Sequence, residues 1–262
     1  MNDDPGNGRA ADVQMPFTSH LAELRNRLVK SILAVTIAFF ACYAVVDDIF
    51  AILAAPLRRL QVRGLTLIGT AVTEAFFTKM KISFFAAVIV ASPVLLWQAW
   101  QFVAPGLYEH EKRYSRSFAL FGSFFFLSGA AFCYQVVFQQ GLSFLLHRYE
   151  VIDIQPMLQV GDYLSLVSRM VLAFGVMFEL PVLAFFLARV GLIDHRVLIR
   201  HSRYAVVVIA LFAAVLTPPD LISQILLMIP LVLLYLVSIA VAYVARLRMN
   251  RRERHVDPNG ES

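Results

Sequence analysis

The sequence Gln101-Phe102-Val103-Ala104-Pro105-Gly106-Leu107-Tyr108-Glu109-His110-Glu111-Lys112-Arg113 connects two long apolar segments of the chain. Pro105 and Gly106 end the first apolar run, which closes with aromatic residues as segments at a membrane surface do. Glu109 and Glu111 then stand at a membrane edge where basic residues are more common. An acidic connector at this position predicts a cationic binding partner.

The composition indicates an integral membrane protein. Apolar residues make up 59% of the 262 residues, charged residues make up 16%, and the mean hydropathy is +0.69, which excludes an ordinary soluble domain. Cys42 and Cys133 both lie in apolar runs, so we interpret them as buried hydrophobic residues and not as a disulfide. The six histidines lack close metal-ligand spacing, and neither a Gly-x-Ser-x-Gly motif nor a phosphate-binding glycine loop occurs. The sequence therefore predicts no enzyme, cofactor, metal site or nucleic-acid partner.

Six apolar segments predict an all-α integral membrane protein with six transmembrane helices. Charged residues, Pro or Gly bound these segments, which cover residues 28–46, 80–104, 117–138, 161–190, 204–216 and 221–244. Sixteen of the 23 Lys and Arg residues lie on the side that carries both termini. The positive-inside rule places that side in the cytoplasm.

The chain divides into three predicted regions. A disordered polar arm covers 1–16, the membrane domain covers 17–245, and a basic, then polar cytoplasmic tail covers 246–262. We expect the tail to be disordered, with its arginines at anionic lipid. Two long outer loops, at about 47–79 and 139–160, contain enough chain to fold over the outer face as a cap.

The fifth apolar segment, Tyr204–Leu216, is too short to cross a membrane comfortably. As a helix it spans about 20 Å, whereas the hydrocarbon core is about 30 Å thick. The tight turn Thr217-Pro218-Pro219-Asp220 follows, so the hairpin must either thin the bilayer or hide its tip behind protein. The alternative is a boundary error of a few residues, with Arg203 snorkelling to the surface. Pro230 favours a bent or effectively short sixth helix, so both of the last two helices are predicted to be short.

Two ionisable residues lie within the fourth apolar segment, Arg169 near its outer end and Glu179 near its centre. A charged side chain at mid-membrane costs about 2.5 to 3.5 kcal/mol, so Glu179 is expected to face a cavity, a partner or its own proton. One interpretation is a polar docking point. Another is a protonated Glu179 that forms a hydrogen bond to a neighbouring helix. A third makes Arg169 and Glu179 the midplane ion or proton site of a secondary transporter for a small solute.

Near the N-terminus, Glu23 and Arg27 are four residues apart and are able to pair on one helix face. If Glu23 shares the cytoplasmic surface with Glu111, the two carboxylates form a site for more than one guanidinium. Alternatively, Lys112 and Arg113 neutralise Glu111 in a solvated charge cluster. The residues alone leave both interpretations open.

Several sequence blocks, in order along residues 17–245, carry a family resemblance. They are Ser19-His20-Leu21-Ala22-Glu23-Leu24-Arg25-Asn26-Arg27-Leu28, Ala55-Pro56-Leu57, Ser92-Pro93-Val94, residues 102–111, Phe174 to Pro181, and Leu216-Thr217-Pro218-Pro219-Asp220 with Ser223-Gln224. A six-span chain with these blocks resembles the TatC family, the polytopic core of the twin-arginine protein translocase.

The resemblance implies a multi-pass protein of the bacterial cytoplasmic (inner) membrane. Members of this family recognise the twin-arginine signal peptides of folded proteins and export those proteins with the proton-motive force. The implied partners are TatB, TatA and membrane lipid, together with self-association in a multimeric receptor complex.

The resemblance also implies roles for individual residues. Glu111 and Phe102 are the expected main contacts of the twin arginines, and Glu23 and Arg25 are expected to shape the same site. Glu179 is expected in a concave, partly hydrated face of the bundle. The expected structural or partner-contact residues are Pro56, Pro105, Asp220 and Gln224.

Two positions depart from the family pattern. Leu236 lies where some relatives are expected to carry an acid, so a polar contact to a partner helix is missing or moved. Glu109 is an extra carboxylate beside the expected site, and it either strengthens or broadens the acidic patch.

Overall fold

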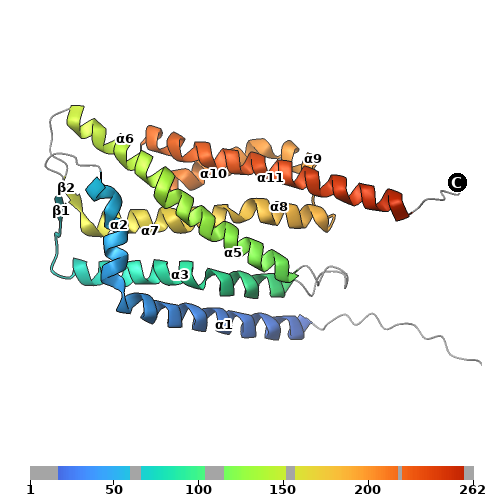
Figure 1. Cartoon of the computed structure of the whole chain (residues 1–262), viewed down its shortest axis with the longest axis horizontal. Coiled ribbons are helices and arrows are strands. Elements are labelled where there is room, and N and C mark those ends of the chain that lie inside the picture. Colours follow the sequence, from blue (N-terminus) through green and yellow to red (C-terminus); the bar gives the residue numbers. More distant parts are fainter. Residues whose placement is uncertain (1–16, 60–65, 104–114, 152–156, 218–219, 257–262) are drawn as a thin grey trace, which may run out of the picture.

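The computed structural model describes residues 17–59, 66–103, 115–151, 157–217 and 220–256. Within these ranges most residues are helical, and the long helices lie alongside one another in a bundle with two distinct ends (Figure 1). The helix α1 begins, and α11 ends, at the same end of the bundle. This arrangement agrees with the prediction that both termini lie on one side, and the positive-inside rule makes that side cytoplasmic.

Five helical segments in the described part of the chain are long and apolar enough to cross a membrane. They are α1 (Phe17–Ala44); α3 (Glu74–Val103); α5 (Ser115–Phe132) continued by a π-helical turn η2 (Cys133–Val137) and α6 (Phe138–Val151); α7 (Val160–Met177) followed by α8 (Glu179–Arg189); and α11 (Leu221–Val256). The helix α10 (Ser202–Leu216) is apolar but shorter. The all-α membrane fold is confirmed, with five helical segments of full length and α10 in the place of the predicted fifth span.

The last helix is not short, contrary to the prediction. The helix α11 has 36 residues and continues through Pro230. One missing backbone bond does not end it, because in lipid every other backbone group still needs a partner within the helix. The helix also continues beyond residue 245 to Val256, so residues 246–256 are helical where a disordered tail was expected. Arg, Met and Glu in this stretch are good helix formers.

The fourth apolar segment is divided at Phe178, where the sequence predicted one continuous span. Pro181 has no N–H with which to bond the carbonyl of Met177, four residues earlier. The helix is interrupted where this hydrogen bond is missing, because α7 ends at Met177 and α8 starts at Glu179. Pro181 therefore lies in the first turn of α8, where proline is tolerated.

The outer end of the bundle carries α2 (Val46–Arg59) and a small sheet formed by β1 (Thr66–Ile68) and β2 (Met157–Gln159) (Figure 1). The two strands are parallel, with Thr66 opposite Met157. These elements come from the two long outer loops that were expected to form a cap. The strands themselves were not predicted, because three residues are too few to produce a recognisable alternation.

Pro56 is buried inside α2 and not in a loop. Because proline lacks an N–H, the carbonyl of Ile52 has no helical donor. The hydroxyl of Tyr134 donates to this carbonyl at 2.5 Å, and the hydroxyl of Tyr163 donates to the carbonyl of Leu53 at 3.1 Å. These two hydrogen bonds hold α2 against η2 and α7.

The main core surrounds α7, which packs against α5 and η2. A Cβ atom added to Gly129 would lie 2.6 Å from Cγ of Phe178 and 2.7 Å from the carbonyl oxygen of Phe174. A Cβ atom added to Gly175 would lie 2.9 Å from Cζ of Phe126. The two helices therefore approach through glycine, as helices in membranes commonly do. Cys133 is buried in this core and is not in a disulfide, as predicted.

Candidate functional site

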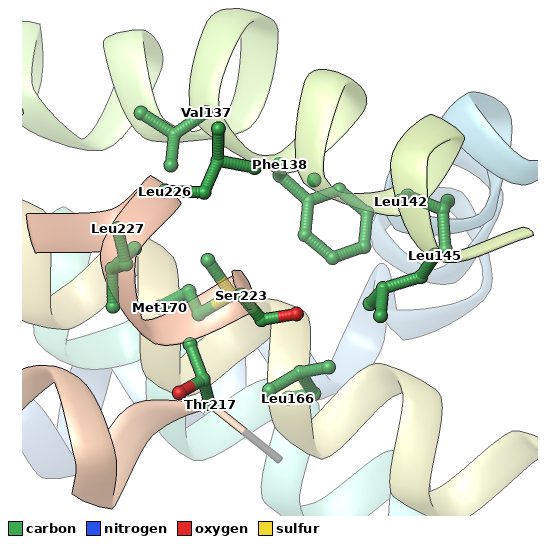
Figure 2. Close-up of a pocket in the computed structure, with 11 residues that line it drawn as sticks. Val137, Phe138, Leu142, Leu145, Leu166, Met170, Thr217, Ser223, Leu226 and Leu227 are labelled. Carbon is green, nitrogen blue, oxygen red and sulfur yellow. The ribbon is translucent and has the colours of Figure 1, made fainter. Parts of the chain in front are cut away.

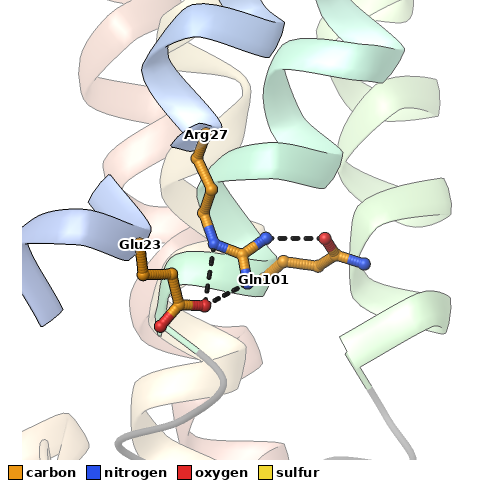
Figure 3. Close-up of polar contacts among 3 residues, drawn as sticks. All are labelled: Glu23, Arg27 and Gln101. Carbon is orange, nitrogen blue, oxygen red and sulfur yellow. Dashed lines mark hydrogen bonds and ion pairs between the residues drawn. The ribbon is translucent and has the colours of Figure 1, made fainter. Parts of the chain in front are cut away.

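Three polar side chains meet at the cytoplasmic ends of α1 and α3 (Figure 3). The Nε atom of Arg27 donates to Oε1 of Glu23 at 3.0 Å, and its Nη2 atom pairs with the same oxygen. The Nη1 atom of Arg27 donates to Oε1 of Gln101 at 2.6 Å. The helices α1 and α3 pack together along their length, which keeps Gln101 within reach of Arg27.

This network leaves one carboxylate oxygen of Glu23 available. Nε and Nη2 of Arg27 both bond Oε1, whereas Oε2 points away from the guanidinium in Figure 3 and has no hydrogen bond to any described residue. The side chain of Glu23 keeps 26% of its surface exposed. An oriented, partly desolvated carboxylate of this kind is well suited to accept a second charge-assisted hydrogen bond.

The expected partner residues follow directly after Gln101. Phe102 lies in the last turn of α3 and is half-buried. Glu111, Glu109 and Pro105 lie outside the described residues, so their positions relative to Glu23 stay predictions.

Arg25 does not join this network. It is exposed on α1, two residues from Glu23, and residues at that spacing do not share a helix face. Gln101 was missed by sequence reasoning, although its place immediately before Phe102 was a usable signal.

Glu179 is buried, with 6% of its surface exposed, at the first residue of α8. Its carboxylate faces Gly122 of α5, where an added Cβ atom would lie 3.0 Å from Oε2. Within the described ranges neither carboxylate oxygen has a hydrogen-bond partner. The helix dipole at the start of α8 is the local feature that favours an acidic residue here.

Arg169 belongs to a different region from Glu179. It is exposed on α7, where its Nε atom donates to the carbonyl of Ser165 at 3.1 Å, and it lines a groove with Lys81 and Asp162. Glu179 is not among the residues that line this groove. The two residues therefore do not form the common midplane site that the transporter interpretation requires.

Asp220 and Gln224 fix the hairpin between α10 and α11. Oδ2 of Asp220 accepts a hydrogen bond from the backbone N–H of Ser223 at 2.7 Å, which caps α11. Nε2 of Gln224 donates to the carbonyl of Ala210 in α10 at 3.0 Å. Asp220 and Gln224 therefore hold the hairpin together through hydrogen bonds within this chain.

A cavity of about 50 Å³ lies beside this hairpin, between α6, α7 and α11 (Figure 2). Leu142, Leu166, Met170 and Leu227 contribute to its apolar lining, and Ser223 and Thr217 contribute hydroxyl groups. No charged residue lines it, so its walls offer little to a polar ligand.

A second polar cluster connects the loop after α8 to α11. Oδ1 of Asp194 lies 2.6 Å from Nδ1 of His195, and the His195 ring packs edge-on against Tyr243. Desolvation opposes ionisation of Asp194, but its interactions with His195 and Arg246 outweigh desolvation and lower the pKa of this carboxyl below its usual value. The cluster lies at the start of α9 (His195–Arg200), at the cytoplasmic end.

Comparisons with known proteins agree with these observations. Residues 19–230 match the family described as "Sec-independent protein translocase protein (TatC)". A protein of that name from Desulforapulum autotrophicum is 41% identical over 94% of this chain and 91% of its own length. Another, from Campylobacter jejuni, is 45% identical over 85% of this chain and 91% of its own length.

A solved structure described as "Crystal Structure of Twin Arginine Translocase Receptor- TatC" has the same fold. It superposes with a TM-score of 0.80 at 37% sequence identity. The match covers 86% of this chain and 99% of that chain.

Proposed function

Because the chain belongs to the TatC family, we propose that it is the signal-peptide-recognising core of a twin-arginine translocase in the bacterial cytoplasmic membrane. In this function it exports folded proteins with the proton-motive force. The observation that carries the proposal is the network of Glu23, Arg27 and Gln101. It already contains a guanidinium bound to a carboxylate, beside the segment that leads to Glu111.

The proposed recognition step uses both carboxylates. Oε2 of Glu23 accepts from one arginine of the signal peptide, and Glu111 accepts from the other. Phe102 contacts the apolar stem or the face of a guanidinium. Arg25 is exposed on another face of α1, so it acts on the site through its charge and not as a direct contact. The apolar part of the signal peptide then enters the membrane, so burial supplies most of the affinity and the charges supply most of the specificity.

The proposed partners are TatB, TatA and further copies of this chain. The exposed apolar faces of α10 and α11 support this assignment, because single-span partners need such surfaces. Asp220 and Gln224 act here by holding the hairpin in place, and Pro56 acts by shaping α2. Glu109 and Leu236 are the two residues that depart from the family pattern. We propose that Pro105 and Glu109 affect the shape and charge of the loop that carries Glu111. We propose that Leu236 changes a contact with a partner helix.

The test measures binding of two peptides to the protein in nanodiscs. The peptides share one sequence and differ only in an Arg-Arg or a Lys-Lys pair. We expect the arginine peptide to bind at least about tenfold more tightly, because an ammonium does not reproduce the planar fork of a guanidinium. Equal affinities would contradict the proposal.

A further inference from the structure

We propose that the groove between α1, α3 and α7 binds one anionic phospholipid of the outer leaflet. Lys81 and Arg169 would hold its phosphate, and the surrounding phenylalanines would hold its acyl chains. In Figure 1, α3 lies between α1 and α7, so α3 forms the floor of the groove and the other two helices form its walls.

Both cations lie within apolar spans, on the outer half of the bundle. Counted from the outer ends of their helices, Lys81 lies about 10 Å along α3 and Arg169 about 14 Å along α7. Cations at this depth are rare and need a partner, because the hydrocarbon does not solvate them. Phosphates of the outer leaflet are the nearest anions that long, snorkelling side chains are able to reach.

The structure leaves both cations without an anionic partner among the described residues. Arg169 bonds the Ser165 carbonyl through Nε, which leaves its two Nη groups for a ligand. Lys79, two residues before Lys81 on the same helix, does have a partner, since its Nζ lies 2.6 Å from Oδ1 of Asp47. Asp162 lines the groove but lies beyond salt-bridge distance of Lys81 and Arg169. Two cations and one carboxylate give the groove a net positive charge, which favours an anionic ligand.

The apolar walls have the chemistry of an acyl-chain site. The groove encloses about 650 Å³, a usual size for a small-molecule site. Its apolar lining comes from two helices and consists of Phe39 on α1 and Phe77, Met80, Phe84 and Phe85 on α3. Phe77 and Phe84 keep 56% and 51% of their surfaces exposed, so the groove is open toward the surrounding membrane. A lipid enters it by lateral diffusion, whereas a soluble anion would have to cross hydrocarbon.

The experiment uses the full chain in nanodiscs of phosphatidylcholine with a small fraction of phosphatidylglycerol that carries a photoreactive acyl chain. Crosslinked peptides are identified by mass spectrometry. We expect crosslinks in the segment from Phe77 to Phe85. The variant Lys81→Gln/Arg169→Gln should reduce them about thirtyfold, because each basic residue near an anionic lipid contributes about fivefold in affinity.

Matched variants separate this site from general attraction and from misfolding. The control Arg58→Gln/Arg59→Gln removes the same charge from exposed positions on α2, and it should leave the crosslinks unchanged. The variant Lys81→Arg/Arg169→Lys keeps both charges and should also keep the crosslinks. The proposal would be overturned if the control lost as many crosslinks as Lys81→Gln/Arg169→Gln, or if Lys81→Gln/Arg169→Gln lost none. It would also be overturned if inorganic phosphate in the buffer competed with the lipid.

Discussion

At the scale of single residues, Glu23 is the centre of the proposed recognition site. The sequence predicted its pairing with Arg27 from their spacing of four residues, and the structure confirms that pair. The third member, Gln101, lies 74 residues from Arg27 in the chain. Its place beside Phe102 was a usable signal, but its contact with Arg27 was not predictable, because apolar periodicity identifies helices and does not give the register between two of them.

Replacing Glu23 by Gln tests this residue directly. Glutamine keeps the size of the side chain but loses its charge, so it forms only neutral hydrogen bonds with a guanidinium. We expect the Kd of a twin-arginine peptide to rise by about tenfold, the value of a lost charge-assisted hydrogen bond. Fluorescence titration in nanodiscs would measure this change.

A matched variant removes a carboxylate elsewhere. Asp48→Asn changes an exposed residue of α2, at the opposite end of the bundle, and should leave the peptide Kd unchanged. If both variants weakened binding equally, the effect would come from net charge and not from the site at Glu23.

At the scale of elements, α5 packs closely against α7 and α8. The apolar runs predicted the helices, but they did not predict the break at Phe178 or the length of α11. The break depends on one missing N–H at Pro181, and the length of α11 depends on continued backbone pairing past Pro230. Both follow from hydrogen bonding within a helix, which hydropathy does not measure.

Gly129 provides a test of this packing. In Gly129→Ala the new methyl group would overlap Phe178 and the backbone of Phe174, and a backbone is not free to move aside. We expect the free energy of unfolding to fall by about 1 to 3 kcal/mol, the usual cost of overpacking. Unfolding by denaturing detergent, followed by circular dichroism, would measure it.

Gly141 is the matched control, on the same continuous helical segment. An added Cβ atom there would lie 3.9 Å from Cδ2 of Leu226, which is an ordinary contact. Gly141→Ala should therefore stabilise the protein by about 0.5 to 1 kcal/mol, because alanine favours a helix over glycine. A Gly129→Ala variant as stable as Gly141→Ala would be inconsistent with this packing.

At the scale of the whole molecule, the short helix α10 affects the thickness of the bilayer around the protein. The helix α10 has 15 residues, or about 22 Å, against a hydrocarbon core of about 30 Å. The predicted segment was short by two residues, and the helix is still too short to cross comfortably. For a short hairpin the sequence left two solutions open, a thinner bilayer or a tip covered by protein. Val215 and Leu221, on either side of the turn, are 72% and 75% exposed, so no described part of the chain covers these two positions. The bilayer is therefore expected to thin beside α10.

Spin labels at Val215 and Val208 would measure this thinning. Both side chains are exposed on α10, Val215 near its outer end and Val208 near its middle. With a thinned bilayer, the label at Val215 should be accessible to a water-soluble nickel chelate, and the label at Val208 should be accessible only to oxygen. A label at Val215 as shielded from the chelate as that at Val208 would argue for a bilayer of normal thickness.

Photocrosslinking from Phe102 tests whether the signal peptide binds at the cytoplasmic ends of α1 and α3. A photoreactive residue replaces Phe102 in membranes that contain either the otherwise native chain or its Glu111→Ala variant. We expect a crosslink to a twin-arginine signal peptide that requires both the arginine pair and Glu111. A crosslink that forms equally well without either of them, or no crosslink at all, would contradict it.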